Sequence, residues 1–479
     1  MTTSELFLVI PELTLLGLAC LVLVLDTVFS RRGTFATYWL TQASLLIVLA
    51  LVLYTGQDEP TRAFVGNFIS DPMSTLLKSV ICLFSLIVFF YSHDYLREHG
   101  LFKGEYFVLG LFAVLGMMVM TSAASLLTVY LGLELLSLSL YAMVAMHKES
   151  PTAPEASMKY FVLGSLASGI LLYGISMLYG ATGTITLQGV AAYTAGNTGS
   201  DLMLVFGLVF VVVGVAFKLG AVPFHMWIPD VYEGSPTAVT LFISSAPKIA
   251  AFAMAIRLLS DGLQALLHDW QGMLIILSVL SMAAGNIIAI AQSNIKRMLA
   301  YSTIAHVGFL SLGLLAGTES GYAGAMFYVI VYALMSMGSF GMVILLGRRG
   351  FEADRLDDFK GLASRSPWFA FIMLVLMFSM AGVPPFLGFW AKWFVFKEVI
   401  AIGGVGVWLA TLAVLFSVIG AYYYLRIVKL MYFDRADSLT AIKASQSMRM
   451  VLSLNGIALL ILGFAPGILM TLCLHAMGM

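Results

Sequence analysis

The chain has 479 residues, of which 61% are hydrophobic and only 10% are charged, and its formal net charge is zero. A soluble domain carries roughly 25% charged residues, so this composition predicts a polytopic membrane protein. Nucleic-acid binding is excluded, because a neutral chain without a basic run offers nothing to a phosphate backbone. The three cysteines (Cys20, Cys82 and Cys473) stand singly in apolar runs, which predicts neither a disulfide nor a metal site.

Apolar runs long enough to cross a bilayer recur along the whole chain. We expect an all-α fold of about fourteen membrane-spanning helices. The tenth run is the weakest, because it contains Ser302, Thr303 and His306, and its polarity indicates an interior position. The expected runs are 6–25, 38–55, 73–92, 106–123, 126–146, 157–180, 202–228, 237–259, 271–290, 298–316, 322–346, 368–399, 404–431 and 451–475.

The positive charges predict which loops face the cytoplasm. If both termini lie outside, the outer loops hold little beyond Arg62, Arg257 and Lys397, as the positive-inside rule requires. The cytoplasmic loops then hold Arg31, Arg32, Arg97, Lys103, Lys148, Lys296, Arg297, Arg348, Arg349, Arg355, Lys360, Arg365, Arg435, Lys443 and Arg449. The chain has no phosphate-binding loop and no dinucleotide fingerprint, so nucleotide or flavin chemistry coupled to it belongs to another chain.

A break is predicted in the seventh helix, within residues 217–230. Lys218 follows a long uncharged run and therefore lies deep in the membrane. Pro223 has no N–H, so the carbonyl of Leu219 loses its helical partner, and Gly220 lets the backbone bend. Such freed groups persist at membrane depth only where protein or water satisfies them, which indicates a hydrated interior. The alternative is a simple proline kink with a lysine that snorkels to the headgroups.

The break recurs. Ala221–Phe224 resembles Val383–Phe386 in the twelfth run, where Lys392 again lies nearby. Five helices separate the two sites, and an odd offset inverts a helix in the membrane, so we expect two inverted five-helix repeats with discontinuous seventh and twelfth helices. Within a single membrane domain of residues 1–479, the expected parts are helices 1–3 in 1–100, the first repeat in 105–260, the second in 268–432 and helix 14 in 449–479.

Four charged residues stand deep in the expected helices or beside their breaks, namely Glu134, Lys218, Lys248 and Lys392, and a fifth, Lys159, lies near the start of the sixth run. Each charge at a helix centre costs about 2.5 to 3.5 kcal/mol on insertion scales, so several in one chain point to an ion or proton pathway. The alternative is a structural pair between Glu134 and a lysine. One carboxylate, however, cannot neutralise three central lysines.

Other polar residues are weaker candidates. His225 at the first break and His306 in the tenth run can each relay a proton at neutral pH, although a lone histidine is usually a packed, hydrogen-bonded one. Tyr424 is retained from a run of three tyrosines. We expect Lys78 to snorkel and Glu12 to lie near the interface, both with structural roles.

Several motifs read together resemble the antiporter-like subunits of respiratory complex I, over nearly the whole chain. Pro-Asp-Val-Tyr-Glu-Gly at 229–234 resembles the subunit N branch of bacterial NADH:quinone oxidoreductase, the counterpart of mitochondrial NADH dehydrogenase subunit 2, better than subunits L and M or the cation/proton antiporters. The motifs that carry the resemblance are 132–138, 217–219, 222–236, 247–250 and 382–385.

The resemblance implies proton translocation in a bacterial cytoplasmic (inner) membrane, with no redox centre in this chain. It implies that Glu134, Lys218, Lys248 and Lys392 are the glutamate of the fifth helix and the lysines of the seventh, eighth and twelfth. Lys159 and His225 match further polar positions on the path. The implied partners are subunits M, L, K, J, A and H and the peripheral NADH-oxidising arm, which hold the FMN, the iron–sulfur clusters and the quinone.

Two other functions remain open at this stage. One is a subunit of an Mrp-like cation/proton antiporter, which would purify as a small flavin-free assembly. The other is a scaffold that only holds neighbouring subunits.

Overall fold

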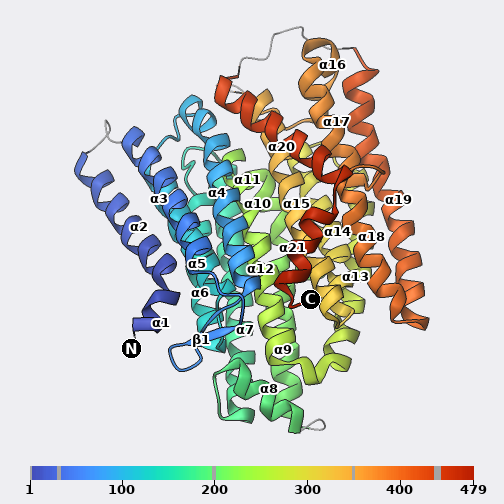
Figure 1. The fold of residues 1–479 in the computed structure, drawn as a ribbon. Coiled ribbons are helices and arrows are strands. Elements are labelled where there is room, and N and C mark those ends of the chain that lie inside the picture. Colours follow the sequence, from blue (N-terminus) through green and yellow to red (C-terminus); the bar gives the residue numbers. More distant parts are fainter. Residues whose placement is uncertain (1–2, 30–33, 197–200, 348–350, 436–443) are drawn as a thin grey trace.

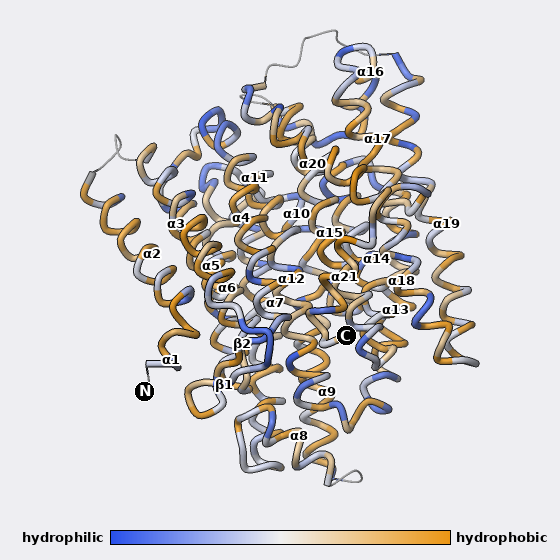
Figure 2. Tube along the Cα trace, viewed as in Figure 1, coloured by the Kyte–Doolittle hydropathy of each residue, from blue (hydrophilic) through white to orange (hydrophobic). Residues whose placement is uncertain are grey.

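The computed structural model describes residues 3–29, 34–196, 201–347, 351–435 and 444–479. Within these residues thirteen helices are long and apolar enough to cross a membrane. One further crossing is made by two shorter helices, so the predicted all-α membrane fold of about fourteen spans is confirmed. The long helices run side by side from end to end of the molecule (Figure 1), and hydrophilic residues gather around the loops at the two ends (Figure 2). The loop charges Arg31, Arg32, Arg348, Arg349 and Lys443 fall outside the described residues.

The first half of the chain supplies the helices on the blue and green side of Figure 1. Its elements are α1 (Thr3–Leu8), α2 (Ile10–Phe29), α3 (Thr34–Thr55), β1 (Thr61–Ala63), β2 (Phe68–Ser70), α4 (Pro72–Glu98), α5 (Gly104–Thr121), α6 (Leu126–Val144), α7 (Thr152–Thr182), α8 (Leu187–Gly196), α9 (Leu202–Leu219), α10 (Trp227–Gly234), α11 (Thr237–Ile243), α12 (Ala246–Ala255), the π-helix η2 (Ile256–Gly262) and the 3-10 turn η3 (Gln264–Leu266).

The second half contains two long buried helices and ends with more peripheral ones. Its elements are α13 (Leu267–Ile290), α14 (Ile295–Leu315), α15 (Glu319–Leu346), η4 (Leu356–Phe359), α16 (Leu362–Arg365), α17 (Pro367–Ala381), α18 (Leu387–Ala401), α19 (Gly404–Tyr432), α20 (Gln446–Phe464) and α21 (Gly467–Ala476). The weakly predicted tenth span is α14, and 94% of its most apolar stretch is buried in the chain. Its polar residues are therefore interior, as expected.

Two short features were not expected from the sequence. Strands β1 and β2 pair antiparallel, with Arg62 opposite Ile69, and α8 forms between the sixth and seventh expected runs. Strands of three residues are too short to show a period of two in the sequence. Both features lie at the lower end of the molecule in Figure 1, where they cover helix ends.

Both predicted breaks are present. The helix α9 ends at Leu219 and α10 begins at Trp227, while α17 ends at Ala381 and α18 begins at Leu387. Gly220 and Gly382 close the first helix of each pair with φ of 91° and 84°, a left-handed conformation that a side chain would strain. The peptide bonds before Pro223 and Pro385 are cis.

The eighth crossing is interrupted as well. The helix α11 ends at Ile243, and α12 begins at Ala246 with Pro247 in its first turn. This is the position where the sequence places a proline next to Lys248, and it agrees with a helix opened one turn away from a buried charge.

In both halves of the chain, a backbone bridge fixes the start of one helix to the segment before another. Ser125, at the start of α6, forms a backbone bridge with Thr186 just before α8. Asn294, at the start of α14, forms one with Arg355 just before η4. The helix α8 lies at the lower end and α16, which follows η4, at the upper end (Figure 1), so the related contacts lie at opposite ends of the molecule.

The structure corrects the placement of several charges outside the predicted path. Lys78 does not snorkel away from the helices: its Nζ and the Oε1 of Glu12 are 2.6 Å apart in a buried pair. Arg257 is buried in η2 rather than in a loop, because its guanidinium binds Asp71 at 2.8 Å and 2.9 Å. Lys296 is also buried, where its Nζ donates to the carbonyl of Ser235 at 2.7 Å.

Asp71 caps the start of α4 and accepts a hydrogen bond from the backbone N–H of Ser74 at 2.8 Å. Burial alone would raise the pKa of this carboxyl, but the Arg257 guanidinium and the Ser74 hydrogen bonds lower it below its ordinary value. The ionised pair therefore connects the start of α4 to the end of the eighth crossing.

Candidate functional site

Glu134 lies in the middle of α6 and is partly buried between α6 and α7. Its carboxylate accepts a hydrogen bond from the hydroxyl of Ser168 on α7. Closely packed glycines hold α6 in place: a side chain on Gly132 would meet the backbone N of Met120 on α5 at 2.7 Å. The only carboxylate in the middle of the predicted path is thus fixed by two neighbouring helices.

Lys218 lies in the last turn of α9, buried against α6. Its Nζ donates to the hydroxyl of Ser137 at 2.9 Å. Ser137 follows Glu134 by three residues on the same helix, so the two side chains are neighbours on one face. Within the described ranges, no ion pair within 4.0 Å reaches Lys218, so the predicted pair is mediated by a serine. A cavity of about 20 Å³ lined by Ser137, Ser168 and Lys218 has room for about one water.

Lys248 lies in α12 and is also buried. Its Nζ donates to the carbonyl of Leu219 at 2.8 Å and lies 5.2 Å from the ring centre of Trp227. Leu219 O is the carbonyl that Pro223 leaves without a helical partner. The lysine therefore satisfies the freed end of α9, next to Lys218. Part of the break is not buried: Pro223 and Met226, between α9 and α10, are exposed on the surface of this chain.

His306 continues the path from the first half of the chain into the second. Lys248 and His306 line one cavity of about 10 Å³ together with Tyr328 and Tyr332, which is about the volume a single water needs. The two imidazole nitrogens of His306 bond the hydroxyls of Tyr328 at 2.6 Å and of Tyr424 at 3.1 Å. A neutral imidazole donates from one nitrogen and accepts at the other, so it can pass a proton between these sides.

Lys392 forms the far end, in α18 just after the second break. Its Nζ donates to the carbonyl of Ala381 at 2.8 Å and to the hydroxyl of Ser417 on α19 at 2.7 Å. It also lies 4.8 Å from the ring centre of Phe309, one turn after His306 on α14. A lysine therefore binds the last carbonyl of the first half-helix at both breaks.

These residues form one row through the molecule, which we name the central axis: Glu134, Lys218, Lys248, His306 and Lys392. Its members can gain or lose a proton. The Ser137 hydroxyl lies between Glu134 and Lys218, and a small cavity lies between Lys248 and His306. The part of the chain that the structure describes contains no group of three metal-ligating side chains. The axis is suited to passing protons.

Comparison with known proteins agrees with this architecture. The family model described as "NADH:quinone oxidoreductase/Mrp antiporter, TM" matches residues 123–420. NADH-quinone oxidoreductase subunit N of Thioalkalivibrio sulfidiphilus is 56% identical, with 98% of this chain and 97% of the relative covered. That of Thiobacillus denitrificans is 57% identical with the same coverage. The chain belongs to the subunit N family.

Solved structures share the fold of the subunit N family. A chain of respiratory complex I from Thermus thermophilus superposes with a TM-score of 0.82 at 32% identity, covering 96% of this chain and 99% of that one. A chain of the Mrp complex from Dietzia sp. superposes with a TM-score of 0.82 at 21% identity, covering 100% and 97%, which shows a common fold. The resemblance predicted from the sequence is confirmed.

Two of the predicted site residues lie off the central axis. The side chain of Lys159 is 44% exposed, and its Nζ binds Asp230 at 2.8 Å and Glu155 at 2.9 Å. It is thus a paired surface charge at the start of α7 rather than a buried one. His225 lies partly buried in the first break, and its Nδ1 is buried with no hydrogen-bond partner among the residues described.

Sequence reasoning missed the hydroxyl groups of the axis. Ser137, Ser168 and Ser417 each bind a charged member of the axis, and Tyr328 binds His306. Serine and tyrosine are common in apolar helices, so their presence alone marks nothing. Only the spacing of Ser137 from Glu134, one helical turn, was a signal in the sequence.

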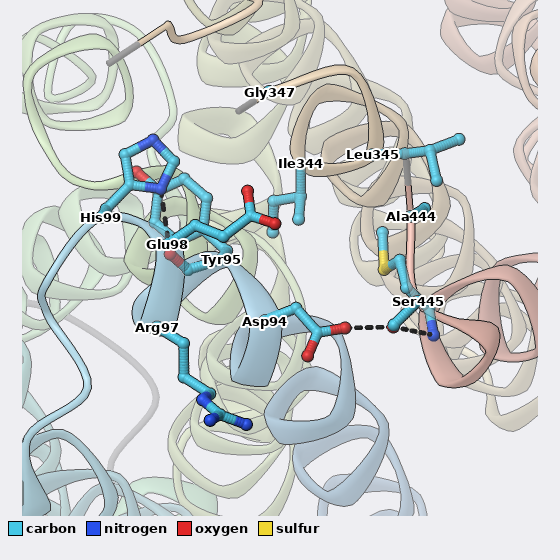
Figure 3. A pocket seen from close by; sticks show the side chains of 11 residues that line it. Asp94, Tyr95, Arg97, Glu98, His99, Ile344, Leu345, Gly347, Ala444 and Ser445 are labelled. Atoms are coloured by element: carbon cyan, nitrogen blue, oxygen red, sulfur yellow. Dashed lines mark hydrogen bonds between the residues drawn. The ribbon is translucent and has the colours of Figure 1, made fainter. Parts of the chain in front are cut away.

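A larger cavity, about 270 Å³ in volume, lies away from the axis between the ends of α4 and α15 and the start of α20 (Figure 3). Acidic and basic side chains line it, among them Asp94, Arg97, Glu98 and His99, and Asp94 accepts a hydrogen bond from Ser445. It contains none of the predicted site residues.

Proposed function

We propose that this chain translocates protons along the central axis as a membrane-arm subunit of NADH:quinone oxidoreductase, driven by redox chemistry in other subunits. The observation that carries the proposal is the row from Glu134 to Lys392, in which Lys248 and Lys392 bind the terminal carbonyls of the two broken helices. Three buried lysines along one row are costly in an apolar bundle, which favours an ion or proton path over a structural role.

The energies involved are compatible with pumping. Moving one proton across about 150 mV requires about 3.5 kcal/mol. A change of about 3 units in the proton affinity of a buried group supplies about 4 kcal/mol. A buried lysine whose proton affinity alternates between a high and a low value that differ by this amount can therefore load and release a proton against the membrane potential.

Each residue of the axis has a separate role in this proposal. Glu134, when ionised, favours charge on Lys218 through Ser137, and its displacement by a neighbouring subunit unloads that lysine. Lys248 and His306 pass the proton through their common cavity from the first half of the chain to the second. Lys392 is the terminal carrier.

The other three predicted site residues have supporting roles next to the central axis. Lys159, held by Asp230 at the surface, and His225 in the first break assist proton uptake. Tyr424 holds His306 through the hydroxyl contact at 3.1 Å and also contacts Ser302 at 2.5 Å.

We further propose that residues 105–260 and 268–432 are inverted repeats, flanked by 1–100 and 449–479. The repeated breaks and the bridges at opposite ends support this division. Both termini then lie on the periplasmic side of a bacterial inner membrane. In support, the basic residue Arg365 lies in α16 at one end of the molecule, and the uncharged α8 lies at the other.

The proposed partners are subunits M, L, K, J, A and H of the membrane arm and the peripheral arm that oxidises NADH. FMN, iron–sulfur clusters and quinone bind in those subunits and supply the redox energy. The alternative, an Mrp-like antiporter subunit, is less supported: the family model covers both kinds of protein, and the Mrp chain shares only the fold, at 21% identity.

Purification separates these two functions. A tagged copy of the chain isolated in mild detergent should bring down flavin and iron–sulfur subunits, whereas a flavin-free assembly would favour the antiporter. In the assembled complex, Lys218→Arg should abolish pumping, because arginine holds its proton at any accessible pH. Pumping at the parental rate by this variant would show that Lys218 is a fixed charge.

A further inference from the structure

Tyr332 on α15 offers protons a second path into the cavity that Lys248 and His306 line. It lines that cavity together with Tyr328. The hydroxyl of Tyr328 bonds His306, but the hydroxyl of Tyr332 bonds Thr303 on α14 at 2.6 Å instead. Tyr332 therefore connects the cavity to a side chain that is not on the central axis.

The hydrogen bonds of Thr303 can be arranged in two ways. Its hydroxyl has one proton and two acceptors in reach, the carbonyl of Leu299 at 2.9 Å and the oxygen of Tyr332. If Thr303 donates to Leu299, Tyr332 donates to Thr303. If Thr303 donates to Tyr332, the proton of Tyr332 points into the cavity. Alternation between these arrangements is the reorientation step that a hydroxyl relay needs.

Tyr232 on α10 lies on the far side of the Tyr332–Thr303 hydrogen bond from the central axis. It is fully buried, its ring lies 5.8 Å from that of Phe340 on α15, and α10 packs against α14. Its hydroxyl has no hydrogen-bond partner among the described residues, and Thr303 and Tyr332 are among its polar neighbours. A buried hydroxyl without a protein partner is normally satisfied by a bound water.

The outer end of α10 reaches polar surroundings. Asp230 and Glu233 on this helix bind Arg297 at 2.9 Å and 2.8 Å, and these side chains are about one third exposed. Water can therefore approach α10 from this end, within two helical turns of Tyr232.

We propose that Tyr232, Thr303 and Tyr332 form a hydroxyl branch that delivers protons from the α10 end of the molecule to the Lys248–His306 cavity. This rests on the proposed function and supplies protons to the cavity, while the charges on Glu134 and Lys218 still decide when Lys248 accepts one. In one transfer, Tyr332 gives its proton to a cavity water next to Lys248 and takes one from Thr303. Thr303 takes a proton from the water beside Tyr232, and that water is reprotonated from the α10 end, so no hydroxyl keeps a net charge.

The test uses single substitutions in the assembled complex in inverted membrane vesicles. Thr303→Val keeps the shape of the side chain but removes its hydroxyl, Thr303→Ser keeps the hydroxyl, and Tyr332→Phe removes only one oxygen. The matched control is Tyr423→Phe, because the buried Tyr423 also bonds a side chain, Asn286 at 3.1 Å, but does not line the cavity. NADH oxidation by ferricyanide measures assembled complex, and a pH-sensitive dye measures pumping in H₂O and D₂O.

Thr303→Val and Tyr332→Phe should each lower pumping about tenfold per assembled complex and raise its solvent isotope effect, because a missing link makes proton transfer limiting. Thr303→Ser and Tyr423→Phe should pump at the parental rate. If Thr303→Val does not assemble, Tyr332→Phe decides alone.

The proposal is overturned if Tyr332→Phe pumps at the parental rate with an unchanged isotope effect, or if Thr303→Ser fails as Thr303→Val does. Lys248→Met is measured in parallel. If it abolishes pumping while the hydroxyl variants do not, the branch is wrong and the central axis stands. If it leaves pumping intact, the proposed function itself fails.

Discussion

Replacement of Lys248 by methionine separates a proton carrier from a structural lysine. Methionine has a similar length but neither charge nor donor, so two effects on stability oppose each other. Loss of a buried ammonium removes an insertion cost of about 2.5 to 3.5 kcal/mol. Loss of the 2.8 Å hydrogen bond leaves the carbonyl of Leu219 unsatisfied, at a cost of about 1 to 3 kcal/mol. The net change in the free energy of unfolding lies between about 2.5 kcal/mol of stabilisation and about 0.5 kcal/mol of destabilisation, so Lys248→Met should assemble.

Pumping should nevertheless be lost, because the proton has no carrier between Lys218 and His306. Lys248→Arg restores a donor to the Leu219 carbonyl but cannot release its proton, so it should also fail. The assay compares dye-detected pumping with ferricyanide reduction in the same vesicles. The ferricyanide reaction, which occurs in other subunits, should persist.

Lys296→Met is the matched control. Lys296 is buried to a similar extent and also donates to a backbone carbonyl, that of Ser235 at 2.7 Å, but it lies off the central axis. Because the same two effects on stability oppose each other here, Lys296→Met should assemble and should keep pumping per assembled complex. Parental pumping by Lys248→Met would refute the reasoning, because the lysine would then serve only to cap α9.

The remaining predictions test the ends of the axis and the frame around it. Glu134→Gln should keep the Ser168 contact but lower pumping at least about tenfold; unchanged pumping would remove the carboxylate from the mechanism. Lys392→Met should stop proton release at the far end, as measured by the same dye, and normal release would place the terminal carrier elsewhere. Asp71→Asn should cost about 1 to 3 kcal/mol near pH 7, because it leaves the buried guanidinium of Arg257 with only one carboxylate partner, Asp261 at 2.9 Å. Since the pKa of Asp71 is lowered, its contribution is present at neutral pH and is lost as the pH falls below about 4, so melting curves of variant and parent should converge in acid. Reporter fusions after Arg365 and after Ser200 should give cytoplasmic and periplasmic signals, and the opposite pair would reject the topology.

The sequence alone determined the number of crossings, the two breaks and the charged members of the axis. Lipid cannot hydrogen-bond or solvate charges. An apolar run long enough to span, a proline that frees a backbone carbonyl and a lysine at the centre of a helix therefore each change the free energy of insertion by a large amount. Such signals can be read one segment at a time. The carbonyl of Leu219 could thus be predicted to need a partner from Pro223 alone.

Only the tertiary structure decided which partner each group meets. That Lys248 caps Leu219, that Ser137 separates Glu134 from Lys218, and that Lys78 pairs with Glu12 all depend on which helices are neighbours. Which helices are neighbours depends on close packing between segments far apart in the sequence, and the residue pattern of a single helix does not show its neighbours. The same reason explains why the pairing of Lys159 with Asp230 at the surface could not be predicted from the sequence.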